Sequence, residues 1–155
     1  MTIDLGQMKR VKAVELWKHE EHDFTPWLAT EENIGRLADA LGLEFQVEGI
    51  EVPVGPFSAD ILAKDTSDNY IIIENQFGKT DHDHLGKILT YAATLGAVTV
   101  VWIAERFTDE HRKAIEWLNE HTRSFLRCRA AEKARVRNFI ANRERITAIS
   151  TAPCR

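Results

Sequence analysis

Apolar residues recur at helical spacing in three stretches of the chain and at strand spacing between them. The stretches 30–42, 80–96 and 108–121 carry apolar residues three or four positions apart, and Gly42 and Gly96 follow the first two where helix C-caps favour glycine. Residues 45–52 and 57–64 alternate instead, and residues 70–76 and 98–104 are almost continuously apolar at first. The pattern therefore predicts helices and strands in alternation.

The order of these segments predicts a mixed sheet. The strands over 57–64 and 70–76 are separated by the turn cluster 65–69, which favours an antiparallel hairpin. The strand over 70–76, the helix over 80–95 and the strand over 98–104 form a crossover unit, which makes the two strands parallel. We expect an α/β fold with a central mixed sheet flanked by helices.

Length and composition limit the possible classes of protein. The chain has 155 residues, of which 44% are hydrophobic and 28% charged, and this suits one globular domain with a core. No apolar run approaches the roughly 18 residues needed to cross a bilayer, so we expect no membrane partner. The first residues lack the apolar centre of a signal peptide, which predicts a cytoplasmic protein.

The charge is unevenly distributed along the chain. Residues 1–121 hold 11 Lys and Arg against 22 Asp and Glu, whereas residues 122–155 hold 9 against 2. The net charge of −4 thus combines an acidic part and a basic part. We expect one domain over 1–121 and a basic C-terminal extension over 122–155 that is partly helical.

Three polar side chains belong to the predicted hairpin. Asp60 lies in its first strand, and Glu74 and Gln76 lie two apart in the second, so these two point to the same face. Paired carboxylates on adjacent strands suit a hard cation such as Mg²⁺, which takes oxygen ligands. The alternative is that they are solvated charges, but Glu74 directly follows three isoleucines, where an unpaired carboxylate would be costly. We therefore favour a metal site that hydrolyses phosphodiesters.

The segments that bear these residues resemble the PD-(D/E)XK nuclease superfamily. The likeness covers roughly residues 5–120 and extends to a prokaryotic branch with a Glu-x-Gln motif. It rests on four strings, namely Asp23–Ala29, Asp60–Ala63, Ile73–Gln76 and Thr80–Gly86. The resemblance implies the three-layer fold of restriction endonucleases, in which helices flank a central mixed sheet.

The resemblance also assigns roles to the matching residues. Asp60 and Glu74 match the two acidic motif positions, which hold the metal ion. Glu32 matches an acidic residue that the superfamily places on its first helix, although helical-wheel geometry brings Glu31 nearer the apolar face. Gln76 replaces the motif lysine and would position the attacking water without supplying a charge.

The missing lysine has two candidate substitutes. Lys87 lies four residues before Tyr91 on one helix face, where relatives carry a pair that contacts DNA. Lys79 lies on the loop that leaves the strand. Solvated side chains are the alternative for both lysines.

Two histidines near the start of this helix, His82 and His84, suit either a transition-metal site or a capped helix start. Because residues i and i+2 do not share a helix face, we favour the second interpretation, with His84 at the edge of the cleft.

Together these residues predict a hydrolase, a Mg²⁺- or Mn²⁺-dependent endonuclease that cuts DNA, with RNA as another possible substrate. Asp60, Glu74, Gln76 and Lys87 would form the catalytic set, and Lys79, His84, Lys87 and Tyr91 would contact nucleic acid. A homodimer is expected, since a small nuclease that cuts two strands often uses two copies of one site. The alternative is an inactive nuclease fold that binds nucleic acid or protein.

Overall fold

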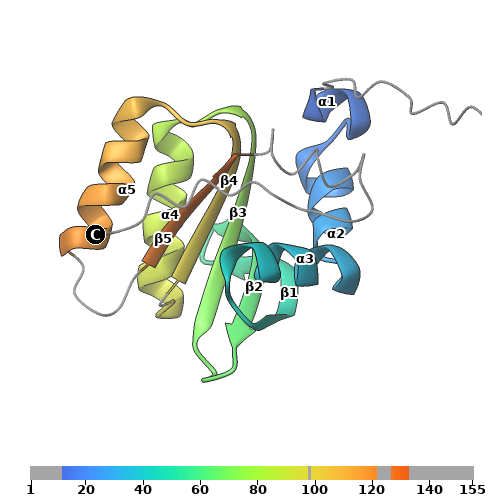
Figure 1. The fold of residues 1–155 in the computed structure, drawn as a ribbon, viewed down its shortest axis with the longest axis horizontal. Coiled ribbons are helices and arrows are strands. Elements are labelled where there is room, and N and C mark those ends of the chain that lie inside the picture. The colour runs from blue at the N-terminus through green and yellow to red at the C-terminus, as the bar shows by residue number, and fades with distance from the viewer. Residues whose placement is uncertain (1–11, 98, 122–126, 133–155) are drawn as a thin grey trace, which may run out of the picture.

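The computed structural model describes residues 12–97, 99–121 and 127–132, the last of these as backbone only (Figure 1). The helical elements are α1 (Ala13–Leu16), the π-helical turn η1 (Glu20–Phe24), α2 (Thr25–Leu28), α3 (Glu31–Leu41), α4 (His82–Leu95) and α5 (Asp109–His121). The strands are β1 (Phe45–Val54), β2 (Phe57–Asp65), β3 (Tyr70–Lys79), β4 (Thr99–Arg106) and β5 (Arg127–Glu132). In this part of the chain no helix has the length and apolar composition that a membrane span requires.

The strands of the described residues form one mixed sheet in the order β1-β2-β3-β4-β5. The β1–β2 and β2–β3 pairs are antiparallel, whereas β3–β4 and β4–β5 are parallel. The first strand pair shifts register between Val47 and Gly49, where the apolar alternation changes parity. The predicted hairpin, the crossover and the central mixed sheet are therefore confirmed.

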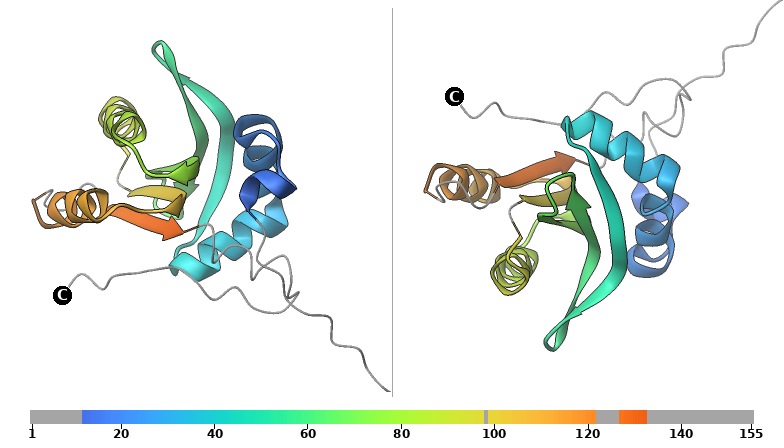
Figure 2. Two further views of the ribbon diagram at one scale, coloured as in Figure 1. Left: turned by 90° about the horizontal axis from the view of Figure 1, so that it is seen from above. Right: turned by 90° about the horizontal axis from the view of Figure 1, so that it is seen from below.

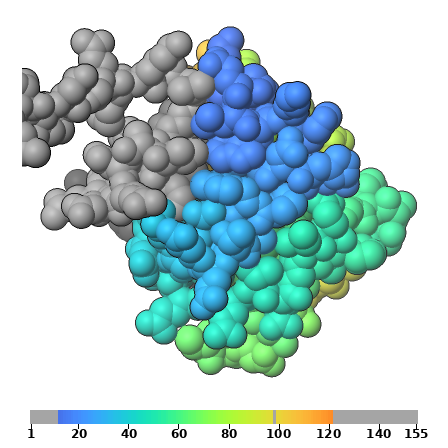
Figure 3. Space-filling view, turned by 90° about the vertical axis from the view of Figure 1, so that its right-hand side faces the viewer, coloured from blue at the N-terminus to red at the C-terminus, as the bar shows by residue number. Residues whose placement is uncertain are grey.

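Helices cover both faces of the sheet, which gives three layers (Figure 2). One face carries η1, α2 and α3, whose apolar residues pack on the side chains of β2, β3 and β4, including Ile61, Ile73 and Val101. The other face carries α4 and α5, which pack on a second cluster that includes Ile72 and Trp102. Residues 12–41 and the β1–β2 hairpin form one continuous face of the molecule (Figure 3). The predicted α/β class is confirmed.

The C-terminal boundary differs from the expectation. Residues 127–132 lie in the segment expected to be partly helical, but they form β5, which pairs with β4 and so belongs to the same sheet. The reason is that the parallel edge of β4 offers hydrogen-bonding groups that a strand satisfies and a helix does not. The rest of the expected extension, residues 122–126 and 133–155, lies outside the described residues.

Candidate active site

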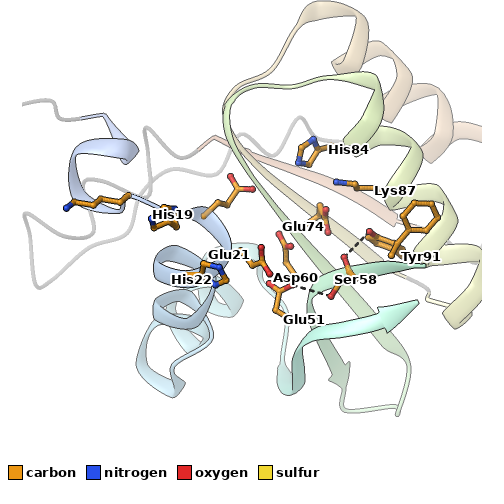
Figure 4. Close-up of a pocket in the computed structure, with 13 residues that line it drawn as sticks. His19, Glu21, His22, Glu51, Ser58, Asp60, Glu74, His84, Lys87 and Tyr91 are labelled. Atoms are coloured by element: carbon orange, nitrogen blue, oxygen red, sulfur yellow. Dashed lines mark hydrogen bonds between the residues drawn. The ribbon is translucent and has the colours of Figure 1, made fainter. Parts of the chain in front are cut away.

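A pocket of about 570 Å³ opens between the N-terminal helical segment, the β1–β2 hairpin, β3 and α4 (Figure 4). Most of its lining is polar or charged. The lining residues are Lys18, His19, Glu20, Glu21, His22, Glu51, Phe57, Ser58, Asp60, Glu74, His84, Lys87 and Tyr91. The structure thus brings together Asp60, Glu74, His84, Lys87 and Tyr91 from the sequence prediction.

The end of the β2–β3 ladder brings Asp60 and Glu74 together. The pairing runs from Lys64–Tyr70 to Ile61–Ile73. One position further, an Oδ2 atom of Asp60 accepts a hydrogen bond of 2.7 Å from the backbone N–H of Asn75. The carboxylate therefore takes the place of a ladder acceptor beside Glu74. We call Asp60 and Glu74 the carboxylate pair.

Glu74 is a deeply buried acid of the pocket. Its residue is 2% exposed, and its buried Oε2 atom has no hydrogen-bond partner among the described residues. Burial, and next the charge of Asp60, raise the pKa of Glu74 to about 9. A carboxylate in this position is costly when it is ionised and unpaired. The pair therefore offers an oxygen that a cation would stabilise.

The π-helical turn η1 supplies the acids on the opposite side of the pair. Phe24 is buried, and its backbone N–H reaches back five residues to the carbonyl of His19 at 3.2 Å. The buried side chains of Thr25 and Asn75 are joined by a hydrogen bond of 2.9 Å, which fixes the end of η1 to β3. Glu20 and Glu21 consequently line the pocket, and the charge of Glu20 adds to the effects that raise the pKa of Glu74.

The sequence analysis did not identify these acids. Their available signal was their place just before the Asp23–Ala29 string that carries the family resemblance. The first-helix acid predicted as a metal ligand is placed elsewhere: Glu32 lies on the exposed face of α3, where it pairs with Arg36, and it does not line the pocket. Glu31 is also outside the pocket, because the inward face of α3 is apolar and faces the sheet.

Gln76, which the sequence predicts to position the attacking water, does not line the pocket either. Its side chain is buried, and its Nε2 donates to the Lys79 carbonyl at 2.8 Å and to Asp81 Oδ2 at 2.7 Å. Its Oε1 accepts from the indole N–H of Trp102 at 3.1 Å. These three bonds hold the Gln76 amide between the β3–α4 connection and β4. Lys79 is exposed and outside the pocket.

The N-terminal half of α4 contributes two basic side chains to the pocket, those of His84 and Lys87. Lys87 Nζ lies 3.1 Å from Asp83 Oδ2. Burial lowers the pKa of Lys87, but the hydrogen bond to Asp83 and the charges of the carboxylate pair outweigh it, so this pKa lies above its usual value. Lys87 is therefore a cation that lines the pocket.

Tyr91 forms a wall of the pocket rather than an exposed contact. Its side chain is buried, and its hydroxyl donates to the Ser58 carbonyl at 2.9 Å. Burial and the carboxylate pair raise the pKa of Tyr91 to about 12. The phenol thus stays neutral and joins α4 to the β1–β2 hairpin.

Glu51 is a further acid that the sequence analysis did not single out. It has a φ of +49°, a left-handed conformation that is uncommon for a residue with a side chain. Its Oε2 accepts from Ser58 Oγ at 3.2 Å, whereas its buried Oε1 has no partner among the described residues. Burial raises the pKa of Glu51. Its strained backbone places a polar oxygen at the pocket wall.

Comparisons with known proteins give only distant likenesses. A scan against protein-family models finds no match, and a search of curated proteins finds none. Similar solved structures include a repair endonuclease from Pyrococcus abyssi, with 19% identity and a TM-score of 0.49 over 66% of this chain and 47% of that one. An EndoMS–dsDNA2 complex has 16% identity and a TM-score of 0.47, over 67% and 45%. Pyrococcus furiosus SfsA with Ca²⁺ has 16% identity and a TM-score of 0.38, over 68% and 53%. The chain spans about half the length of each of these structures.

Proposed function

We propose that the protein is a divalent-metal-dependent endonuclease that hydrolyses phosphodiester bonds in DNA. The observation that carries this proposal is the buried Oε2 of Glu74, which has no partner in the described structure and lies in the pocket with Asp60. An ionised carboxylate in that position is costly unless a cation binds it. The residues that form the pair are those on which the sequence resembles the PD-(D/E)XK nucleases.

The donor set fits Mg²⁺ or Mn²⁺. Among the described residues no group of three or more His, Cys, Asp or Glu side chains is arranged so that it could hold a metal ion, so the protein would supply two ligands. Mg²⁺ commonly takes one or two carboxylates and fills its remaining positions with water and phosphate oxygens. Asp60 and Glu74 would hold the ion, and Glu20 lines the same pocket. When bound, such an ion supplies Lewis-acid stabilisation of the charge on the phosphate.

Lys87 replaces the motif lysine in this proposal. A phosphodiester in the pocket would add negative charge, and the Lys87 ammonium is positioned on α4 to offset it. The pKa of Lys87 is raised, so the side chain keeps its charge at neutral pH. Gln76 holds the start of α4 and therefore positions this helix rather than the attacking water.

A plasmid-nicking assay tests the proposal. Wild-type protein should nick supercoiled DNA with Mg²⁺ or Mn²⁺ and not with EDTA, and Asp60→Asn should abolish nicking. Asp39→Asn, an exposed aspartate on α3, is the matched control and should keep full activity. A single-stranded RNA substrate in the same assay distinguishes the two nucleic acids. No cleavage of any substrate, with intact folding, would favour the inactive nuclease fold instead.

Calorimetric titration with Mn²⁺ separates metal binding from cleavage. Wild type should bind the ion, and Asp60→Asn should bind it much more weakly, because it loses one of two anionic ligands. Sedimentation of the protein with and without duplex DNA tests the expected homodimer.

A further inference from the structure

His84 and Asp81 form a carboxylate–imidazole dyad at the edge of the pocket. His84 Nδ1 lies 2.8 Å from Asp81 Oδ1. Because an ionised carboxylate only accepts, this contact fixes the proton on Nδ1. Nε2 has no partner among the described residues, and the His84 side chain is 19% exposed and lines the pocket (Figure 4). The ring therefore has one nitrogen held by protein and one nitrogen available to a ligand.

Asp81 is held in place by groups other than the histidine ring. Its Oδ1 also accepts from the backbone N–H of His84 at 2.9 Å, which makes Asp81 the cap of α4. Its Oδ2 accepts from Gln76 Nε2 at 2.7 Å, and Gln76 is in turn bonded to Trp102. A buried amide thus orients the carboxylate, and the carboxylate orients the imidazole, as in other sites where a third group positions a catalytic histidine.

Hydrolysis of a phosphodiester needs a proton for the leaving oxygen, since an alkoxide is strongly basic. The carboxylate pair cannot supply this proton while it holds a metal ion. The Tyr91 hydroxyl already donates to the Ser58 carbonyl. Lys87 is paired with Asp83 and offsets phosphate charge. Among these groups, His84 alone combines a fixed orientation with a nitrogen that no described residue binds.

We propose that His84, positioned by Asp81 and Gln76, is the general acid that protonates the leaving oxygen, a role that rests on the endonuclease function proposed above. The water oxygen forms a bond to phosphorus while the bond from phosphorus to the leaving oxygen breaks. In this step His84 acts as the imidazolium, with protons on both nitrogens. The leaving oxygen takes the Nε2 proton and leaves the neutral ring with its proton on Nδ1, and the proton lost by the attacking water passes to solvent. Solvent then returns a proton to Nε2, so the imidazolium is restored.

Substrates with different leaving groups test this role. The leaving group in DNA cleavage is an alkoxide, which needs a proton. The leaving group of a p-nitrophenyl ester of thymidine 5′-phosphate is p-nitrophenolate, which is stable without one. His84→Gln should lower kcat on DNA by about 10²-fold or more, the usual contribution of a general acid, and change kcat on the nitrophenyl ester by less than about tenfold. The control is His121→Gln, since His121 is bonded to the Trp117 carbonyl on α5 and lies outside the pocket.

Asp81 requires a variant that keeps the helix cap. In Asp81→Asn the side-chain oxygen can still cap α4 while the negative charge is lost. We expect the same preference for the nitrophenyl ester, with a smaller loss on DNA than in His84→Gln, and a lower thermal midpoint, because the Asn amide N–H2 cannot accept from Gln76 Nε2. A purely structural role would lower both activities together and would not produce this dependence on the leaving group.

The outcomes separate this proposal from the proposed function. Suppose that wild type cleaves both substrates, and that His84→Gln lowers kcat on both by the same factor or leaves both unchanged. His84 is then not the general acid, and the endonuclease proposal stands. If wild type cleaves neither substrate with Mg²⁺ or Mn²⁺, the endonuclease proposal fails, and the acid role fails with it.

Discussion

The pKa of Glu74 predicts how the stability of the metal-free protein depends on pH. Burial and the charge of Asp60 raise the pKa of Glu74 from its ordinary value of 4.5 to about 9. Between pH 4.5 and about pH 9, Glu74 is therefore ionised in the unfolded chain and protonated in the folded protein, so folding takes up a proton. The contribution of Glu74 to stability is fully present below the unfolded pKa and is lost as pH rises through the folded pKa. Replacing it with the isosteric amide, Glu74→Gln, removes this dependence.

The magnitude follows from the proton count. Between pH 6 and pH 8 the folded protein holds one more proton at Glu74 than the unfolded chain does. One proton corresponds to about 1.4 kcal/mol per pH unit, so the free energy of unfolding should fall by about 3 kcal/mol over this range through Glu74 alone. For a chain of this size that is a decrease of roughly 5–10 °C in the thermal midpoint.

The assay is equilibrium unfolding by urea at pH 6, 7 and 8 in EDTA. Other groups also titrate, so the measured quantity is the difference in slope between wild type and Glu74→Gln. Glu44→Gln, which changes an exposed acid before β1, is the control and should keep the wild-type slope. If Glu74→Gln has the same pH dependence as wild type, Glu74 is ionised in the folded protein and the argument from burial is wrong.

The other predictions concern α4 and its connection to β3. Gln76→Lys, which restores the family lysine, should lower the free energy of unfolding by about 1–3 kcal/mol and should not raise nicking activity, because it breaks the bond from Trp102. Increased nicking would contradict the structural role of Gln76. Lys87→Met should lower kcat on DNA by about 10²-fold with little change in the thermal midpoint, and unchanged kcat would exclude Lys87 from the site. Tyr91→Phe removes the bond to the Ser58 carbonyl and should cost about 1 kcal/mol in urea unfolding.

The hydrophobic periodicity was sufficient to predict the main helices and strands, because burial of an apolar face decides where they form. The stripe of Ile34, Leu37, Ala38 and Leu41 must be buried, and α3 buries all four against the sheet. The parity change at Gly49 reflects the bulge in the β1–β2 ladder. Strand geometry places Glu74 and Asp60 on one face of the hairpin in the same way, so the sequence was sufficient to predict the carboxylate pair.

The rest of the site depends on contacts between residues far apart in the chain. The placement of η1 depends on the bond between Thr25 and Asn75, which are 50 positions apart. Gln76 shares the face of Glu74, yet its amide forms hydrogen bonds with Trp102 on β4 and with Asp81 at the start of α4, and it does not line the pocket. No local pattern records either contact. β5 was missed because its sequence lacks a strand pattern and the edge of β4 determines its conformation.

The π-helical geometry of η1 makes the site sensitive to chain length as well as to residue type. A residue added to or removed from an α-helix rotates what precedes it by about 100° around the axis. Deleting one residue between Glu20 and Phe24 would close the wide turn, leave Phe24 in the core and turn Glu20 away from the carboxylate pair. Two chains could then carry the same acids in the same order, and only the one with the extra residue would present them to a substrate.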